Sequence, residues 1–348
     1  MAIDLKRLCL GCMNLLPQAG VVCPVCGYSS TVNDNQAHLP AGTRLKMGNK
    51  DYLIGVALGQ GGFGIVYVAW DVINNRKVAV KELFPESIVK RTRIYSVAIK
   101  NQSDQDIYNS FLKNFNQEYK NMKLFNGNPN TVTVLDYIEA NGSAYIVMDF
   151  IQGTTLSQEI AKVGGRLPLA IVLEKLSPIV AVLEQIHGMG YQHRDISPDN
   201  IMFESDRGIA KLMDFGAARN YDPSHPTTIA VLKEGYAPPE QYNVSNEQSR
   251  KGAWTDVYAL AATIYYAITG VVPHNSSTRE INGHDLLELP SRLGINISPT
   301  QEQTLIKGMA LDYNKRYKNV NIFFNTLKGV VPPQNDTWKK CFLTLLLL

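Results

Sequence analysis

The chain has 348 residues, of which 45% are hydrophobic and 19% are charged, and this composition excludes a disordered or fibrous protein. The length allows one large domain or two of medium size. A formal net charge of +3 without a long basic run gives no reason to expect a nucleic-acid partner.

The N-terminal region is marked by two C-x-x-C pairs that are separated by ten residues: Cys9, Cys12, Cys23 and Cys26. Paired knuckles of this kind bring four thiolates within tetrahedral reach of one ion, which suits structural Zn²⁺ and leaves no open position for catalysis. Gly11 and Gly27 are expected to ease the turn beneath each pair. A redox pair or an iron–sulfur site is the alternative.

The chain divides into four parts. We predict a zinc ribbon over residues 1–27, a polar linker over 28–44, a globular domain over 45–330 and a tail over 331–348. The globular part has no cysteine, which excludes a disulfide framework there and indicates a reducing, cytoplasmic compartment. The N-terminus has no apolar run of signal-peptide length.

The tail ends in an apolar run after Trp338 that is far shorter than the about 20 residues needed to cross a bilayer. It is either a segment that packs on a protein surface or the start of a truncated transmembrane helix. The second interpretation, which we favour slightly, would anchor the chain to the inner face of the membrane.

Strand and helix patterns follow one another along the globular part. Alternating or β-branched residues predict strands at 52–58, 65–70, 77–82, 131–138 and 145–150, the last two joined by an Asn141-Gly142 turn. Apolar residues at helical spacing predict helices at 110–125, 169–189, 256–269 and 301–309. A β-rich half before an α-rich half predicts an α+β chain of two lobes with a site between them.

A glycine cluster lies between the first two predicted strands. Glycines in this arrangement let a hairpin backbone approach phosphates closely, because no Cβ intervenes. The pattern alone is weak, since dinucleotide-binding proteins and ordinary tight turns share it. Strand residues follow the cluster, which disfavours the dinucleotide interpretation. The segment comprises Leu58, Gly59, Gln60, Gly61, Gly62, Phe63 and Gly64.

Lys81 ends an alternating strand, and Glu118 lies on the predicted helix that follows. An ion pair between them would direct the lysine towards the α- and β-phosphates of a nucleotide. Taken singly, Lys81 is more typical of a solvated strand and Glu118 of an exposed helix face.

The strongest signal is a His-Arg-Asp sequence ending at Asp195, followed by Asn200 and then by Asp214-Phe215-Gly216. An Asp next to an acceptor hydroxyl can orient it and take its proton. An Asn and a second Asp supply the oxygen ligands that Mg²⁺ prefers when it bridges phosphates.

In this combination the chain resembles a eukaryotic-type Ser/Thr protein kinase, over residues 45–330 and most like the bacterial members. Three further residues match family positions. Glu240 matches the residue that closes the activation segment, Arg316 its ion-pair partner, and Asp256 the brace of the catalytic loop.

The resemblance implies a bilobal kinase fold that binds ATP with Mg²⁺, or Mn²⁺ as the alternative metal. Asp195 would be the catalytic base, while Asn200 and Asp214 would hold the metal. Val66, Ala79 and Met202 would enclose adenine, with Met148 as gatekeeper and Asp149-Phe150 as hinge. A protein substrate is the expected partner, its identity and the oligomeric state being left open.

Two family positions differ here. Ser197 stands where the family usually has a Lys that neutralises the γ-phosphate, and Lys233 stands where it usually has a Thr. We predict that these roles are exchanged, with Lys233 supplying the cation and Ser197 the hydroxyl. The alternative is a weakened enzyme in which Lys233 is merely exposed.

Two segments remain open to interpretation. The connection between Lys81 and Glu118 is about twice the family's usual length, and is either a small β insertion that restrains the helix or a docking surface. Ser224, Thr227 and Thr228 in the activation segment are either phosphorylation sites that would pair with Arg194 or ordinary loop hydroxyls.

The main hypothesis is an active Ser/Thr protein kinase. A pseudokinase scaffold that binds nucleotide without transferring phosphate is the alternative, and Ser197 is the residue that favours it. A small-molecule kinase is disfavoured by the full activation segment that ends at Glu240.

Overall fold

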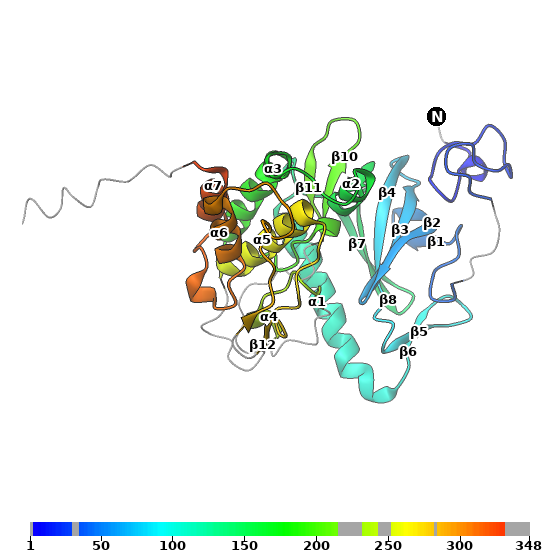
Figure 1. Cartoon of the computed structure of the whole chain (residues 1–348). Coiled ribbons are helices and arrows are strands. Elements are labelled where there is room, and N and C mark those ends of the chain that lie inside the picture. Colours follow the sequence, from blue (N-terminus) through cyan, green and yellow to red (C-terminus); the bar gives the residue numbers. More distant parts are fainter. Residues whose placement is uncertain (1–2, 30–34, 215–231, 243–251, 282–283, 331–348) are drawn as a thin grey trace, which may run out of the picture. The chain divides into compact units, whose positions relative to one another are not determined.

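The computed structural model describes residues 3–29, 35–214, 232–242, 252–281 and 284–330. The chain forms two compact units (Figure 1). Unit 1 comprises Met1–Leu156 and Asp199–Lys233, and unit 2 comprises Ser157–Pro198 and Glu234–Leu348. In the described part of the chain, unit 1 is built mainly of strands and unit 2 mainly of helices.

Unit 1 is organised around a six-stranded sheet in the order β1-β2-β3-β4-β8-β7, in which all neighbours are antiparallel. Strands β2, β3, β4 and β8 follow the predicted alternation and are one to five residues longer than predicted, whereas β7 is shorter and begins three residues later than predicted, and β1 was not predicted. Their bounds are β1 Arg44–Met47, β2 Lys50–Gly61, β3 Gly64–Asp71, β4 Arg76–Leu83, β7 Val134–Ala140 and β8 Ser143–Asp149.

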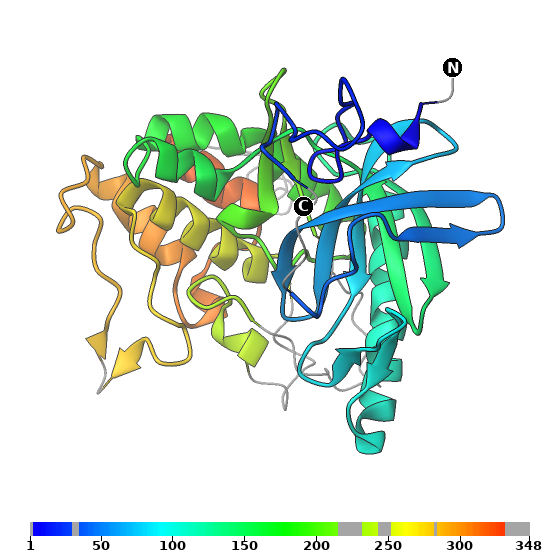
Figure 2. The ribbon, with the colours of Figure 1, turned by 90° about the vertical axis from the view of Figure 1, so that its right-hand side faces the viewer.

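Helix α1 (Gln105–Leu124) packs against β4, β7 and β8 of this sheet (Figure 2). It begins five residues before the predicted start. Its buried residues, which include Phe115, Glu118 and Met122, recur at helical spacing. The predicted Asn141-Gly142 turn joins β7 to β8, with φ values of 55° and 70° that match a type I′ hairpin.

The insertion before α1 contains the short strands β5 (Val89–Arg91) and β6 (Val97–Ile99), which pair as a hairpin. The β insertion, one of the two alternatives, is therefore present. A separate three-stranded sheet in the order β11-β10-β9 completes unit 1. Its strands are β9 Gly153–Thr155, β10 Ile201–Glu204 and β11 Ala210–Leu212.

Unit 2 is centred on α5 (Ala253–Thr269), of which nearly every residue is buried. Helices α3 (Leu169–Gly188), α6 (Pro299–Gly308) and α7 (Val320–Lys328) pack with it and with one another. Ser298 and Gln301 form a reciprocal capping box at the start of α6, with Pro299 in the first turn.

Shorter elements complete the described chain. They are α2 Leu156–Lys162, α4 Pro239–Tyr242, β12 Glu280–Ile281, β13 His284–Asp285 and the 3₁₀ turns Leu5–Arg7, Gln102–Asp104, Pro198–Asn200 and Tyr313–Lys315. Within the described ranges no helix combines the length and apolarity that a membrane crossing requires. The tail at 331–348, the phosphorylation candidates and Phe215-Gly216 lie outside these ranges.

Candidate active site

Lys81 lies between two carboxylates in unit 1. Its Nζ is 2.7 Å from Oε1 of Glu118 and 2.8 Å from Oδ1 of Asp214. The predicted ion pair between Lys81 and Glu118 is therefore present. Glu118 is almost completely buried, with 6% of its side chain exposed, whereas Asp214 keeps 36% exposed. The Lys81 ammonium thus contacts two carboxyl groups, one deep in unit 1 and one near its surface.

These contacts change the pKa values of Glu118 and Lys81. Burial raises the pKa of Glu118 to about 8, and the Asp214 carboxylate adds to this rise while Lys81 opposes it. Burial alone would lower the pKa of Lys81, but the carboxylates of Asp214 and Glu118 outweigh burial and raise it. Lys81 is therefore protonated, as phosphate binding requires.

Asp214 follows β11, which is fastened to the rest of unit 1. Leu212 pairs with the segment that precedes β7, donating its N–H to the carbonyl of Asn130 at 2.8 Å. The next N–H, from Met213, donates to the carbonyl of Asn200 at 2.8 Å. The two predicted metal ligands, Asn200 and Asp214, are thereby linked through the backbone. Asp214 has a left-handed φ of 54°, a conformation that Asp tolerates better than most residues.

The glycine cluster forms the turn between β2 and β3, and Gly61 and Gly64 are its last paired residues. A Cβ at Gly64 would lie 2.5 Å from the carbonyl oxygen of Glu82, so only glycine fits there. By contrast, Gly59 and Gly61 have open space where a Cβ would be, which leaves their backbone accessible. Phe63 packs on Phe111 of α1 with ring centroids 5.2 Å apart.

The predicted adenine-facing residues share one sheet face. Val66 lies directly opposite Lys81 across the β3–β4 pairing, and Ala79 lies opposite Met148 across the β4–β8 pairing. Opposed residues in a ladder project from the same face, so Lys81, Val66, Ala79 and Met148 do so together. Met202 lies on β10 in the smaller sheet of unit 1.

The predicted hinge follows β8. Asp149 donates its N–H to the carbonyl of Thr133 at 2.9 Å, and its carboxylate lies 3.3 Å from Arg76. Phe150 is half-buried, with the Lys77 ammonium 4.9 Å from its ring centroid.

In unit 2, the segment that carries Asp195 is held by Asp256 of α5. The Asp256 carboxylate accepts the N–H groups of His193 and Arg194, both at 2.8 Å, and pairs with Nε2 of His187 at 2.7 Å. Burial would raise the pKa of Asp256, but these donors lower it. The expected brace of the catalytic loop is confirmed. Asp195 itself is half-buried.

The expected ion pair between Glu240 and Arg316 is also present in unit 2. Arg316 binds Glu240 in a bidentate manner, at 2.6 and 3.0 Å, and both side chains are at least 96% buried. Thr255 donates its hydroxyl to the same carboxylate. The end of the activation segment is thereby fastened to the helical core.

The two residues of the proposed exchange have different surroundings. Ser197 is fully buried in unit 2. Lys233 belongs to unit 1, where its ammonium contacts the carboxylate of Asp199, and the two side chains are 34% and 57% exposed. A partly exposed ion pair of this kind contributes little stability. The exchange of roles stays a prediction.

The sequence did not predict the ion pair between Arg91 and Glu82, the residue that follows Lys81. Arg91 of β5 binds Glu82 in a bidentate manner, and Glu82, the residue after Lys81, also accepts the hydroxyls of Tyr67 and Tyr145 at 2.9 Å. Arg91 further donates to the carbonyl of Ala37 in the linker. The β5–β6 hairpin is thus fastened to the strand that carries Lys81. Its docking role stays a prediction.

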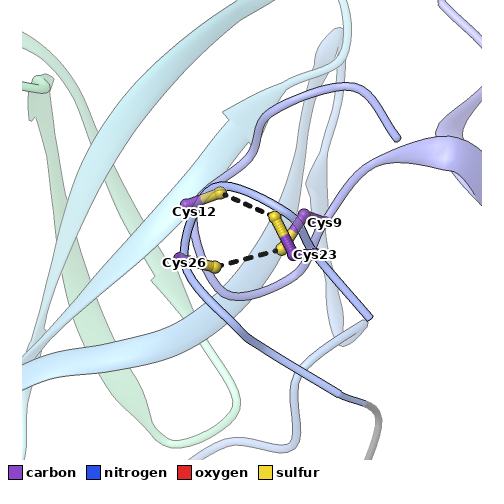
Figure 3. A group of neighbouring side chains, drawn as sticks. All are labelled: Cys9, Cys12, Cys23 and Cys26. Carbon is purple, nitrogen blue, oxygen red and sulfur yellow. Dashed lines mark hydrogen bonds between the residues drawn. The ribbon is translucent and has the colours of Figure 1, made fainter. Parts of the chain in front are cut away.

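The four N-terminal cysteines form a second candidate site in unit 1 (Figure 3). Their sulfur atoms all lie within 4.8 Å of one another. Cys9 is 3.6 Å from Cys26, and Cys12 is 3.7 Å from Cys23. In a tetrahedral site with Zn–S bonds of about 2.3 Å, neighbouring sulfurs are about 3.8 Å apart, so this arrangement fits zinc.

The thiols of this cluster differ in proton affinity. Burial raises the pKa of Cys9 to about 12. Burial would also raise the pKa of Cys23, but the backbone N–H groups of Cys26 and Val25 outweigh it and lower that pKa to about 6. A ready thiolate in the cluster favours metal binding, because metal ligands are deprotonated thiols.

The turn beneath the first knuckle differs from the prediction. Gly27, which follows Cys26, has a φ of 71°, as expected for a glycine after a knuckle. In the first knuckle, however, the left-handed residue is Met13, with a φ of 56°, and not Gly11. Gly11 is required for space instead, because a Cβ there would lie 2.5 Å from Cβ of Tyr28.

A strand-rich unit with a Lys–Glu ion pair, joined to a helical unit with a braced Asp loop, defines a protein kinase fold. The sequence profile of the protein kinase domain family matches residues 52–321, and the chain belongs to that family. The solved structure described as the apo form of PpkA-294 is 34% identical to it, with a TM-score of 0.69. The match covers 84% of this chain and 99% of that one.

Curated relatives include bacterial Ser/Thr kinases. A probable serine/threonine-protein kinase of Clostridium perfringens is 30% identical over 84% of this chain and 40% of its own length. Serine/threonine-protein kinase B of Synechocystis is 26% identical over 88% of this chain and 51% of its own length. The chain thus spans about half, or less, of these two relatives. The kinase domain of Mycobacterium tuberculosis PknI shares the fold, at 21% identity and a TM-score of 0.60.

Proposed function

We propose that this protein is a Ser/Thr protein kinase that transfers the γ-phosphoryl group of Mg·ATP to a protein hydroxyl. The observation that carries this proposal is the contact of Lys81 with both Glu118 and Asp214 at 2.7 and 2.8 Å. A lysine oriented by a buried glutamate is the feature on which nucleotide positioning in this family depends. The relatives support the same activity.

The proposed roles follow from the chemistry of each group. Lys81 binds the α- and β-phosphates, and Glu118 orients it. Asn200 and Asp214 hold Mg²⁺, for which Mn²⁺ is the alternative, and the metal neutralises charge on the phosphates. Asp195 accepts the proton of the attacking hydroxyl as the new O–P bond forms and ADP leaves with the electrons of the broken bond.

The cation that usually follows the catalytic Asp is absent, and Lys233 is proposed to replace it. Ser197 would then take the hydroxyl's role. The contact between Lys233 and Asp199 supports this proposal, because the Lys233 ammonium is partly exposed to solvent and an ion pair of this kind contributes little free energy. Electrostatic stabilisation of the transition state contributes much of the rate of phosphoryl transfer. Loss of this cation without a replacement would therefore lower the rate strongly.

The test compares wild type, Asp195→Asn and Lys233→Ala with labelled Mg·ATP and a generic protein acceptor. Wild type should incorporate label into protein, Asp195→Asn should lose nearly all incorporation, and Lys233→Ala should lose nearly as much. Equal incorporation by wild type and Asp195→Asn would exclude Asp195 as the base. Nucleotide binding without incorporation would favour the pseudokinase alternative, and label in a small acceptor would favour a small-molecule kinase.

We also propose that Cys9, Cys12, Cys23 and Cys26 hold one structural Zn²⁺. The close approach of the four sulfurs supports this proposal, and four thiolates leave the metal no open position. Metal analysis of the purified chain should find one zinc ion per chain. Cys12→Ser should lose that ion, whereas Cys341→Ser, which changes the cysteine outside the cluster, should retain it. Iron or a disulfide in place of zinc would contradict the assignment.

A further inference from the structure

The first cysteine knuckle is hydrogen-bonded to the strand that leads into the glycine cluster. Leu10, which lies between Cys9 and Cys12, accepts the N–H of Val56 in β2 at 2.9 Å. The β2–β3 register shifts between Ile54 and Ala57, so the ladder is irregular where this bond forms. The knuckle therefore satisfies a backbone donor of β2 that lies three residues before Gly59.

Gly55 permits this approach. A Cβ at Gly55 would lie 2.4 Å from the Leu10 carbonyl oxygen, 2.5 Å from Cε of Met13 and 2.8 Å from Cγ1 of Val68. The first of these atoms belongs to the backbone and cannot rotate away. No other residue at position 55 would leave the knuckle where it is.

Apolar side chains extend the contact. Leu8 and Met13 form a buried cluster with Leu53, Val68 and Trp70 of β2 and β3. Val68 lies directly opposite Ala79 in β4, so both project from the same sheet face. The knuckle therefore packs on the face that carries the predicted adenine and phosphate residues. The hinge residue Phe150 packs against the same cluster.

The linker adds a second contact at the glycine cluster itself. Nε2 of His38 lies 2.9 Å from Oε1 of Gln60, and Nε2 of Gln60 donates to Glu86 at 2.8 Å. The His38 ring also lies edge-on to Tyr67 of β3, with centroids 6.3 Å apart. The N-terminal segment thus contacts β2 at Val56 and again at Gln60, on either side of Leu58 and Gly59.

We propose that the N-terminal segment is a positioning element for the glycine cluster, so that metal occupancy of the cysteines sets nucleotide affinity. Leu10 and Met13 are the positioning residues, and Gly55 is the site they engage. The proposal rests on the proposed kinase function. Its physical basis is a series of three contacts. The metal holds the first cysteine knuckle in one conformation, and the knuckle holds Val56 through its hydrogen bond. The position of Val56 then determines where β2 places the phosphate-binding glycines.

Met13→Gly tests the contact without removing the metal site. Glycine suits a left-handed φ, as Gly27 shows in the second knuckle, so the variant should still bind one zinc ion. It lacks the side chain that packs on Val68. We expect Mg·ADP to bind about tenfold more weakly, which is the scale of one lost buried contact. Met13→Leu, which restores apolar volume, should recover most of the affinity.

Gly55→Ala tests the approach from the side of the strand, and Gly188→Ala is its matched control. Both replace glycine with alanine at ordinary φ, but Gly188 has open space where the methyl group would lie. Gly55→Ala should weaken Mg·ADP binding and increase amide hydrogen exchange in a peptide spanning 52–64. Gly188→Ala should alter neither.

Removal of zinc by a chelator should raise exchange in the same peptide and weaken Mg·ADP binding, and added Zn²⁺ should restore both. One outcome would contradict the coupling and leave the kinase proposal intact. In that outcome wild type binds Mg·ADP, and the zinc-free protein, the Met13→Gly variant and the Gly55→Ala variant all bind it as tightly as wild type does. If wild type itself does not bind Mg·ADP, the proposed function fails first.

Discussion

Arg91 and Glu82 form a bidentate ion pair with N–O distances of 2.6 and 2.7 Å, and their side chains are 4% and 0% exposed. The pair joins the β5–β6 hairpin to the strand of Lys81. Because Glu82 also accepts two tyrosine hydroxyls, its carboxylate is fully satisfied only when Arg91 is present.

Arg91→Met should therefore destabilise the protein strongly, because it leaves a buried carboxylate without a cation. We expect a loss of about 3–5 kcal/mol in the free energy of unfolding, measured by urea denaturation. Arg44→Met is the matched control, since Arg44 and Asp51 form a bidentate pair at the surface, and it should cost no more than about 1 kcal/mol. Equal losses in the two variants would contradict this account.

Asp256→Asn should weaken the catalytic loop in a pH-dependent way. The lowered pKa of Asp256 means that its stabilising effect is present above its ordinary value of 3.8 and is lost as the pH falls below it. Near neutral pH the variant should lose about 3 kcal/mol, given three hydrogen bonds to a buried carboxylate. Unfolding curves of wild type and variant should converge towards low pH. A constant difference down to pH 2 would show that Asp256 acts without its charge.

Glu118→Gln should remove a pH dependence of the free energy of unfolding whose sign is opposite to that expected for Asp256. The pKa of Glu118 is raised from 4.5 to about 8, so the folded protein retains a proton that the unfolded chain releases. Wild-type stability should therefore fall as the pH rises from 4.5 to about 8, by up to about 1.4 kcal/mol per pH unit. The variant should lack this slope. Unfolding is measured without nucleotide or divalent metal, and parallel curves for the two proteins would refute the shift.

Lys233→Ala and Asp199→Asn should separate stability from activity. The ion pair between these residues is exposed, so either variant should change the free energy of unfolding by less than about 1 kcal/mol. Lys233→Ala should nevertheless lose activity nearly as heavily as Lys81→Met, whereas Asp199→Asn should retain it because Lys233 remains. Near-normal turnover by Lys233→Ala would end the hypothesis that Lys233 replaces the missing cation.

Local patterns predicted much of unit 1. The β-branched alternation around Lys81 and the glycines after Leu58 carry strand and turn information within a few residues of sequence. The helix that carries Glu118 was predictable from the spacing of Phe115 and Met122, but the pairing of Glu118 with Lys81 was predicted only because other motifs accompany it. The brace from Asp256 and the pair of Glu240 with Arg316 came from the family resemblance and not from spacing.

Contacts made by single residues in irregular segments were not predictable. Arg91 lies in a segment without strong periodicity, and nothing local shows that its partner is the residue after Lys81. Met13 was missed because glycine is the usual left-handed residue, and its side chain is retained by packing against β3 that only the tertiary structure reveals. The glycine at position 55, inside an otherwise regular strand pattern, was the one available hint of a close backbone approach.

The contact between Lys81 and Asp214 bears on the order in which a metal ion and a nucleotide would bind. The ammonium rests 2.8 Å from Oδ1 of the carboxylate that is proposed to hold the metal. A divalent ion that binds Asp214 without a nucleotide would meet the positive charge of the Lys81 ammonium at the same carboxylate. Metal and triphosphate that arrive together avoid this conflict, because the phosphates receive Lys81 as the ion takes its place. Charge repulsion from Lys81 thus disfavours a divalent ion that arrives without a triphosphate.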